Sequence, residues 1–460
     1  MAQVSVGETL RFSGLLLTRT LRTGETTRTY GGAPRSPPAE MPTTSDLGTG
    51  ASMSTGAGRV ISVTCQRLRW SALDGFVHPD FVGVAQMFRR QVSRRARSGA
   101  SLAVYHRGEP VLDIWGGTRG DGHPWREDTM AMAFSTTKGI AATSLHILAD
   151  RGLIGYDDLV STHWPAFARH GKDGLTVRHL LSHDAGLHAL RPELEHATEM
   201  LDWDHMVEVM EGMTPRWAPR HATGYHGITF GWLIGELVRR VSGMPLKHFV
   251  DKEIAAPLKL DGLFIGAPAS EMDRVARLKM GALKLGDVDS TASRIKALSR
   301  SLRLKLDLTQ TIDTFLIRGF DELLASEDVY QAEIPAMTGI FTARSVARLY
   351  ATLAGGGQLG GVRLLSAETV RAASVQQNNR IDRVVGYPMR FRLGYHGAFT
   401  TSGIPSRGIA HYGYGGSGGF ADPHTDLAVG YVVNSAGGTP TADARLPFLA
   451  GAALRAARKR

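Results

Sequence analysis

Strand-like segments stand at both ends of the regular part of this chain, with helical segments between them. Near the start, residues 101–105 and 111–115 are apolar and rich in β-branched and aromatic side chains. Residues 106–110, between them, have the Gly and Pro of a hairpin turn. Near the end, residues 428–433 have the same strand character. This order predicts one sheet built from the two ends of the chain, with a helical insertion.

Helical periodicity dominates the rest of the regular chain. Apolar side chains recur every three or four residues, which predicts helices at 81–97, 136–151, 176–181, 200–211, 230–241, 246–253, 340–355, 366–375 and 442–458. We therefore expect a discontinuous α/β (α+β) sheet domain of residues 75–164 and 326–460. Residues 165–325 should form a helical domain.

The amino-terminal residues 1–74 differ in composition from the rest. They hold many Thr, Ser, Gly, Pro and Arg residues and no periodic segment, which predicts a disordered extension. A regulatory tail and a mis-assigned start are both open, because Met41 and Met53 could begin the chain. The Leu run at 15–17 is too short for a signal-peptide core, and no stretch approaches the ~18 apolar residues of a membrane span. We expect a cytoplasmic protein, and peripheral association with the cell envelope stays open.

Composition excludes several classes of protein. The single cysteine among 460 residues, Cys65, excludes an internal disulfide framework and fits a reducing compartment. The formal net charge of +10 would favour nucleic acid only if it were clustered. The basic groups near residues 89–97, 300–305 and 455–460 are short and lack interleaved aromatic side chains. We interpret them as solvated faces and expect no nucleic-acid partner.

A serine and a lysine three positions apart are the first candidates for chemistry. A serine hydroxyl attacks well only when a neighbouring base takes its proton or a cation stabilises its alkoxide. Ser135 and Lys138 would share one face of a helix, and the apolar residues 141, 145 and 148 predict that helix. The positive end of the helix dipole would then favour charge on Ser135. Alone, the pattern is short enough to occur by chance.

Two further segments could complete such a site. Tyr225 precedes the expected helix 230–241, and its phenol could act as a general base if nearby cations lowered its pKa. A core or surface aromatic role is the alternative. His411 and Gly413 lie in a strand-like run before a Gly-rich stretch. A strand edge there could give a backbone N–H to an oxyanion, and Gly413 would allow close approach of substrate.

In this order, the three motifs resemble those of the serine β-lactamase and penicillin-binding-protein superfamily. They are Ser135-x-x-Lys138, Tyr225, and His411-x-Gly413, the last matching the Lys/His-x-Gly strand of that superfamily. Each motif is weak alone, but the ordered set is specific.

The resemblance extends over residues 75–458. Other segments similar to the family are 180–187, 224–236 and 420–423. The resemblance implies an antiparallel sheet flanked by helices and an all-helical domain, with the site between them.

Two departures place the nearest likeness with class C β-lactamase-like family VIII carboxylesterases. Gly227 stands where a β-lactamase carries the Asn that binds the lactam side-chain amide, and the third motif begins with His411 in place of Lys. A mostly neutral imidazole anchors a carboxylate less well than an ammonium. Both changes weaken lactam recognition and spare ester chemistry. Replacing His411 by Lys and Gly227 by Asn should therefore raise lactam turnover relative to ester turnover.

The resemblance also implies a mechanism of acyl transfer. Ser135 attacks the ester carbonyl, while Lys138 and Tyr225 share its proton, with Tyr225 the favoured base. Backbone N–H groups of Ser135 and Tyr414 should bind the oxyanion. His411 should hydrogen-bond Tyr225 or the leaving group. No metal or cofactor is needed.

Two other patterns were weighed and set aside. Residues 415–419 fit the Gly-x-Ser-x-Gly nucleophile elbow around Ser417, but a strand follows where that motif needs a helix, and His424 stands too near to serve as a triad partner. A Gly-rich turn is favoured. The histidines at 179, 183, 188 and 196 lack metal-ligand spacing, so capping and polar-loop roles are favoured over zinc.

Three hypotheses about function remain. The first is a serine carboxylesterase acting on a small-molecule ester. The second is a β-lactamase, D-amino-acid peptidase or transpeptidase, against which Gly227 and His411 argue. The third is a non-catalytic binding member of the fold, against which Ser135, Lys138 and Tyr225 argue. Acyl chain length, alcohol and oligomeric state stay open.

Overall fold

The computed structural model describes most of the chain from Cys65 onward. The described residues are 65–460 without 69, 71, 94–97, 121, 281–291, 294–307 and 437–442, together with the strand Leu47–Gly48. They all belong to one unit, residues 44–460. Most of residues 1–74, which the sequence predicts to be disordered, lie outside the described part of the chain.

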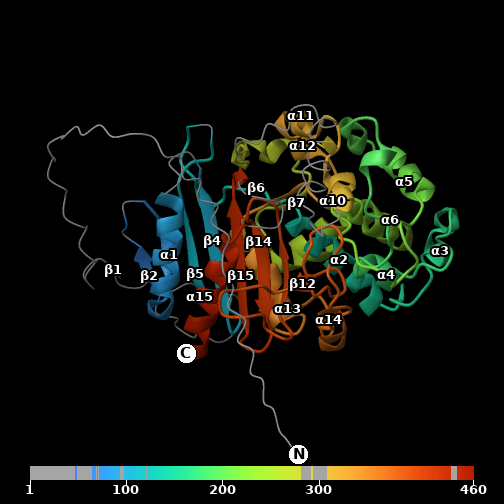
Figure 1. Ribbon diagram of the computed structural model, residues 1–460. Coiled ribbons are helices and arrows are strands. Elements are labelled where there is room, and N and C mark those ends of the chain that lie inside the picture. Colours follow the sequence, from blue (N-terminus) through green and yellow to red (C-terminus); the bar gives the residue numbers. More distant parts are fainter. Residues whose placement is uncertain are drawn as a thin grey trace, which may run out of the picture. The chain divides into compact units, whose positions relative to one another are not determined.

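A nine-stranded antiparallel sheet joins the two ends of the chain (Figure 1). In spatial order its strands are β1 (Leu47–Gly48), β2 (Gln66–Leu68), β3 (Asp74–Val77), β5 (Glu109–Gly116), β4 (Ala100–His106), β15 (Leu427–Val433), β14 (Gly418–Asp422), β13 (Ile409–Tyr412) and β12 (His396–Gly397). The junction is the pairing of β4 with β15, in which Leu102 lies opposite Tyr431. The prediction of one sheet built from both ends is confirmed.

Helices cover both faces of this sheet. They are α1 (Val82–Ser93) and α15 (Arg445–Lys459) on one face and α13 (Ala343–Ala354) on the other. Because strand side chains alternate between faces, Leu102 and Val104 pack in the apolar cluster of α1 and α15, while Ala103 and Tyr105 pack in that of α13. The central strands β4 and β15 are therefore buried on both faces.

A small antiparallel sheet of β6 (Ala131–Met132), β9 (Gly339–Phe341) and β7 (Leu263–Ile265) is separate from the large one, and the remaining described helices complete the fold. These helices are α2 (Thr136–Asp150), α3 (Val160–His163), α4 (Val177–Leu181), α5 (Trp203–Gly212), α6 (Phe230–Ser242), α7 (Leu246–Val250), α8 (Ala256–Leu258), α10 (Leu308–Phe315), α11 (Phe320–Ala325), α12 (Asp328–Gln331) and α14 (Ala367–Ser374). The expected helical interval 165–325 also contains β7 and the strand β8 (Lys279–Met280). Its limits as a domain stay a prediction.

Capping residues explain where two expected helices begin later than their periodicity suggested. The Asp202 carboxylate accepts the backbone N–H groups of Asp204 and His205, so α5 starts at Trp203. Thr342 caps α13, and the residues before it form β9. Apolar periodicity alone cannot separate a buried strand from the helix that follows it.

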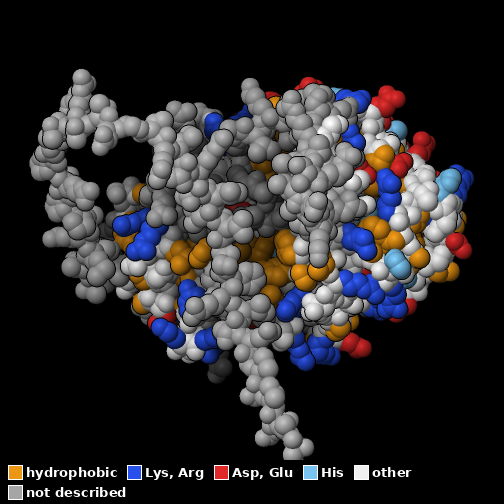
Figure 2. Space-filling view, in the orientation of Figure 1, with side chains coloured by type: hydrophobic (Ala, Val, Ile, Leu, Met, Phe, Trp, Pro, Cys, Tyr) orange, Lys and Arg blue, Asp and Glu red, His pale blue; other side chains and the backbone are white. Residues whose placement is uncertain are grey.

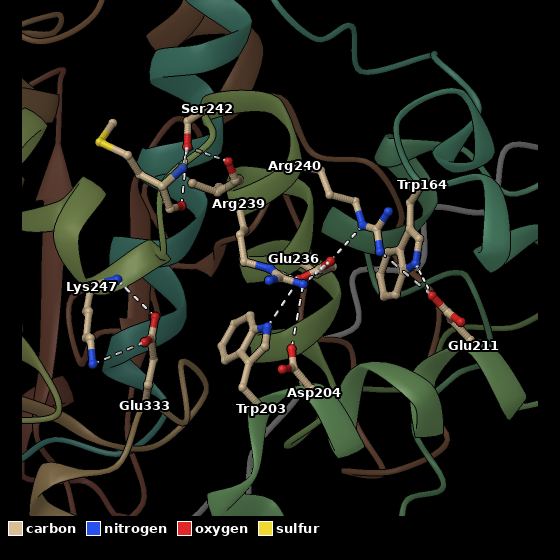
Figure 3. Close-up of polar contacts among 12 residues, drawn as sticks. Trp164, Trp203, Asp204, Glu211, Glu236, Arg239, Arg240, Ser242, Lys247 and Glu333 are labelled. Atoms are coloured by element: carbon tan, nitrogen blue, oxygen red, sulfur yellow. Dashed lines mark hydrogen bonds and ion pairs between the residues drawn. The ribbon is translucent and has the colours of Figure 1, made fainter.

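A buried carboxylate fastens α6, the helix that packs most closely on α2 (Figure 3). The fully buried Glu236 accepts hydrogen bonds from Arg239 Nε at 2.6 Å, Arg240 Nε at 2.6 Å and Trp203 Nε1 at 3.1 Å. Arg240 Nη2 is also 3.9 Å from Glu211 Oε1. Such charge-assisted bonds satisfy a carboxylate that would be costly to bury unpaired. The cluster ties α5 to α6.

We expect Glu236→Ala to lower the free energy of unfolding measurably. Breaking a buried pair costs about 3–5 kcal/mol when the partner charge stays buried. Arg239 and Arg240 are each about one-third exposed and can turn to water, so we expect about 2–3 kcal/mol by urea unfolding. Lys247→Ala, which removes a half-exposed lysine 3.8 Å from Glu333, is the control and should cost at most about 1 kcal/mol. Equal losses in the two variants would contradict this account.

Surface charge is dispersed on the visible face of the molecule. Figure 2 shows Lys and Arg side chains in separate groups among acidic and uncharged ones. The absence of a nucleic-acid partner stays a prediction. Among the described helices, none has the length and apolar character needed to cross a membrane.

Candidate active site

Ser135 stands immediately before α2, at its N-cap position. Its backbone is helical (φ −63°, ψ −8°) and its side chain makes no capping hydrogen bond, so Oγ is available for chemistry. The side chain is partly exposed, whereas its neighbours in the chain are buried. Phe134 before it has φ +47°, a strained conformation for a bulky residue. This sharp turn presents Ser135 at the positive end of a 15-residue helix.

Hydrogen bonds to β9 fix the turn that carries Ser135. The Ala133 N–H donates to the Gly339 carbonyl at 2.8 Å, and the Gly339 N–H donates to Thr137 Oγ1 at 2.9 Å. The same hydroxyl donates to the Phe134 carbonyl at 2.5 Å. The strained turn is therefore held from both sides, which positions Oγ before any substrate arrives.

Lys138 lies one turn into α2 and is fully buried. Its Nζ is 3.0 Å from Ser135 Oγ, 2.7 Å from the Gly227 carbonyl oxygen and 3.1 Å from the Ala336 carbonyl oxygen. Burial lowers the pKa of this amine well below its ordinary value. The amine donates to Ser135 Oγ and to both carbonyl oxygens. Because the carbonyls can only accept, a neutral amine would keep its two N–H groups for them and turn its lone pair to Ser135.

Tyr225 completes the group around Ser135. Its hydroxyl hydrogen-bonds the Ser135 side chain, and its ring centroid is 5.0 Å from Lys138 Nζ. Phe391 stacks on the ring at 6.1 Å with an interplanar angle of 9°. Burial raises the pKa of Tyr225 above its ordinary value, so the phenol stays protonated at neutral pH. This differs from the expectation that Tyr225 ionises, because desolvation disfavours the phenolate.

The loop that carries Tyr225 is fastened by buried acidic and amide side chains. Asp184 accepts from Thr223 Oγ1 at 2.8 Å and from Asn378 Nδ2 at 3.2 Å. Asp382 is buried beside the Tyr225 loop, and burial raises the pKa of its carboxyl to about 7. Its charge contributes to the raised pKa of Tyr225. Sequence reasoning missed these residues, since isolated Asp and Asn residues far apart in the chain form no motif.

His411 lies on β13 and faces the same group. Its ring centroid is 6.4 Å from that of Tyr225 and 5.0 Å from that of His396. Burial, helped by the charges that His396 and Lys138 can carry, lowers the pKa of His411 well below its ordinary value. The imidazole of His411 is therefore neutral at neutral pH. The same state was assumed when His411 was compared, from the sequence, with the lysine ammonium of a β-lactamase. Among the hydrogen bonds of the described residues, none joins His411 to Tyr225, and Nδ1 has no partner.

Gly413 and Tyr414 bring the end of β13 against the turn before Ser135. A Cβ at Gly413 would lie 2.1 Å from the Ala133 carbonyl oxygen, so glycine is required by the protein's own backbone. From the sequence, Gly413 was instead expected to make room for a substrate. The N–H groups of Ser135 and Tyr414 donate to no acceptor among the hydrogen bonds of the described residues. Both are free to bind an oxyanion.

The patterns set aside in the sequence have structural roles. Ser417 is buried, and its Oγ accepts the Val433 N–H at 3.1 Å, next to strand β14. The Gly-rich turn interpretation is confirmed. His179 and His196 accept backbone N–H groups at helix starts, which confirms their capping roles.

Comparison with known proteins agrees with this geometry. Residues 84–454 match the family described as "Beta-lactamase". The chain belongs to the β-lactamase family. It is therefore a serine hydrolase of the β-lactamase superfamily, with the antiparallel sheet and flanking helices that its sequence predicted.

Similar proteins of the β-lactamase family include esterases. The "Esterase/beta-lactamase LipL" of Mycobacterium tuberculosis is 38% identical over 368 residues, which cover 78% of this chain and 82% of that protein. The crystal structure of a family VIII carboxylesterase has a TM-score of 0.74 and 32% identity over 84% of this chain and 99% of its own. A penicillin-binding-protein homologue from Caulobacter crescentus has a TM-score of 0.72 and 31% identity over 84% of this chain and all of its own.

Gly227 differs from what we expected of a β-lactamase family site. A Cβ at Gly227 would lie 2.4 Å from Cε1 of Phe315 and 2.7 Å from Cγ2 of Thr314, both in α10. An Asn side chain there needs the Phe315 ring and the Thr314 methyl to shift. The expected gain in lactam turnover for Gly227→Asn stays a prediction, and the structure adds Phe315, a residue that no sequence motif marks, to the surroundings of Gly227.

Proposed function

We propose that this member of the β-lactamase family is a serine carboxylesterase that forms its acyl-enzyme on Ser135. The observation that carries the proposal is the position of Ser135 Oγ, 3.0 Å from the buried amine of Lys138 and hydrogen-bonded to Tyr225. The names of LipL and of the family VIII carboxylesterase, which are esterases, support an ester as substrate. The partner is a small-molecule ester.

Acylation begins with proton transfer from Ser135 to the neutral amine of Lys138. Ser135 Oγ attacks the ester carbonyl carbon, and the N–H groups of Ser135 and Tyr414 stabilise the oxyanion. As the tetrahedral intermediate collapses, the alkoxide leaves with a proton relayed from Lys138 through the Tyr225 hydroxyl. Tyr225 thus acts as a phenol that passes a proton, and Lys138 is the base.

Deacylation repeats these steps with water. Lys138 and Tyr225 take a proton from the water as it attacks the acyl carbonyl, and Ser135 leaves with the proton returned. The products are a carboxylic acid and the free enzyme. Each step uses only these side chains and backbone N–H groups, so the mechanism requires no metal or cofactor. His411 lies near Tyr225 as a neutral ring.

β-Lactam hydrolysis is the second candidate, because the similar protein LipL is named both an esterase and a β-lactamase. A β-lactam needs partners for its carboxylate and its side-chain amide. His411 is neutral, and Gly227 offers no amide. We therefore place ester hydrolysis first.

A comparison of substrates tests this order. We expect kcat/KM for p-nitrophenyl butyrate to exceed that for a chromogenic cephalosporin by about 10- to 10,000-fold, since two unpaired polar groups cost about 1–3 kcal/mol each. Both rates are measured spectrophotometrically, with Ser135→Ala as the background. Equal efficiency towards both substrates would refute the argument from His411 and Gly227.

A cytoplasmic location accompanies the proposal. The single cysteine, Cys65, is a free, partly buried thiol, and it suits a reducing compartment.

A further inference from the structure

An aromatic side chain from α10 fills the space beside the Tyr225 loop. Phe315 is partly exposed, and its ring centroid is 6.4 Å from that of Tyr225. Its Cε1 would lie 2.4 Å from a Cβ at Gly227, whose carbonyl accepts the hydrogen bond of Lys138 at 2.7 Å. Phe315 therefore touches the backbone that holds the proposed base.

Helix α10 is fastened in this position from two directions. Thr311 Oγ1 donates to the carbonyl of Val384, in the loop that packs on Tyr225. On another side, Gln310 Oε1 is 2.7 Å from His188 Nε2, with His188 fully buried. These bonds keep Phe315 beside Gly227.

Phe315 belongs to a satellite apolar cluster separate from the two main cores. The buried members of this cluster are Tyr225, Val384, Met389 and Phe391. Phe315, Val385, Tyr387 and Phe399 pack against them and are partly exposed. Partly exposed apolar side chains around a proton-transfer residue suit an apolar part of a substrate, whose burial there removes more surface from water.

We propose that Phe315 is a specificity-determining residue, which closes the space at Gly227 and, with Val385, Tyr387 and Phe399, forms a wall for an apolar alkyl or aryl group of the ester. This inference rests on the proposed ester hydrolysis and names its substrate class. The apolar side chains of this wall offer no hydrogen-bond partner to a substrate amide beside Gly227. The Phe315 ring also occupies the space that a side chain at position 227 would need. Polar groups at that position would be buried without partners.

Two series of esters of increasing chain length test whether Phe315 belongs to this wall. We expect Phe315→Ala to lower the ratio of kcat/KM for a long ester over a short one by about tenfold or more. One series varies the acyl group of p-nitrophenyl esters and the other varies the alcohol of acetate esters, so the series that responds identifies the group on the wall. Phe320→Ala, a partly buried phenylalanine of the main core, is the matched control and should leave both ratios unchanged. Unchanged ratios in Phe315→Ala would overturn the inference.

A double-mutant cycle tests the contact at Gly227. Gly227→Ala should lower kcat/KM in the wild-type background, because overpacking against Phe315 shifts the carbonyl that binds Lys138. In the Phe315→Ala background the same change should cost at least about tenfold less, as expected for residues in contact. An equal cost in both backgrounds would show that the contact with Phe315 does not set the cost of a side chain at Gly227, and that Thr314, whose Cγ2 would also lie 2.7 Å from that Cβ, sets it instead.

A readout without turnover separates this inference from the proposed function. We expect a long-chain alkyl fluorophosphonate to label Ser135 faster than its ethyl homologue, and Phe315→Ala to remove that preference. If labelling follows this pattern but no ester is hydrolysed, the proposed function fails and the wall stands. If esters are hydrolysed and labelling shows no dependence on chain length in either variant, the wall fails and the proposed function stands.

Discussion

Ser135→Ala should abolish ester hydrolysis while the protein stays folded. Removing the nucleophile of a serine hydrolase lowers kcat by on the order of 10⁵-fold or more, because the acyl-enzyme cannot form. The Oγ makes no capping bond in α2, so the helix loses little when it is removed. The measurement is kcat/KM for p-nitrophenyl butyrate, with circular dichroism and the melting temperature as checks on folding.

Ser417→Ala is the matched control for that loss. Ser417 is the serine of the Gly-x-Ser-x-Gly pattern, and its Oγ accepts the Val433 N–H in the sheet. We expect it to keep most of its activity with a small loss of stability, since one buried hydrogen bond is worth about 1 kcal/mol. Mass spectrometry after fluorophosphonate labelling should place the adduct on Ser135. An adduct on Ser417 would overturn the site.

Lys138→Met should lower ester turnover by about 10³-fold or more, because general-base catalysis is lost together with the alignment of Ser135. The wild-type profile of kcat/KM against pH should fall on the acidic side, where the amine of Lys138 becomes protonated and can no longer accept a proton. This acidic limb should move below the usual lysine range, since burial lowers the pKa of Lys138. A wild-type profile that falls only above pH 10 would contradict the base assignment.

The same substitution should change how stability depends on pH. The folded pKa of Lys138 is lowered, so between this value and the unfolded pKa of about 10.4 the unfolded chain binds more protons. This contribution makes the wild type more stable as pH rises through that window, and Lys138→Met should lose it. Lys172→Met is a control, because Lys172 is also buried, with its pKa lowered to about 8, yet its Nζ binds the Glu211 and Met213 carbonyls. It should alter the stability profile and leave the acidic limb of activity in place.

Local patterns predicted much of the secondary structure. The strands at 101–105, 111–115 and 428–433 are β4, β5 and β15, and the helix after Ser135 is α2. These segments have strong periodicity or β-branched composition, and their neighbours in space reinforce those preferences. Boundaries were less secure: the expected helix 246–253 is observed as α7, which ends at Val250 and is followed by a π-helix at Asp251–Ala255.

Ordered motifs predicted the family and the candidate site, and the tertiary structure set the surroundings of the residues in that site. The sequence carries Ser135, Lys138 and Tyr225 as residue types, but burial decides their proton affinities. Lys138 has no carboxylate among its hydrogen-bond partners, so desolvation favours the neutral amine. Tyr225, which we expected to ionise, is buried too, and desolvation favours its neutral phenol. Burial is a property of the folded chain and has no local sequence signature.

The sequence by itself determined one sheet shared by the two ends of the chain, a helical insertion, and the ordered motifs that resemble those of the β-lactamase family. Strand composition, helical periodicity and the order of the motifs can be read from the sequence alone, because they do not depend on how the chain folds. Only the tertiary structure decided that Lys138 faces two carbonyls, that Asp382 lies beside the Tyr225 loop, and that Phe315 fills the space at Gly227. These contacts join residues far apart in the chain, and close packing in three dimensions sets them.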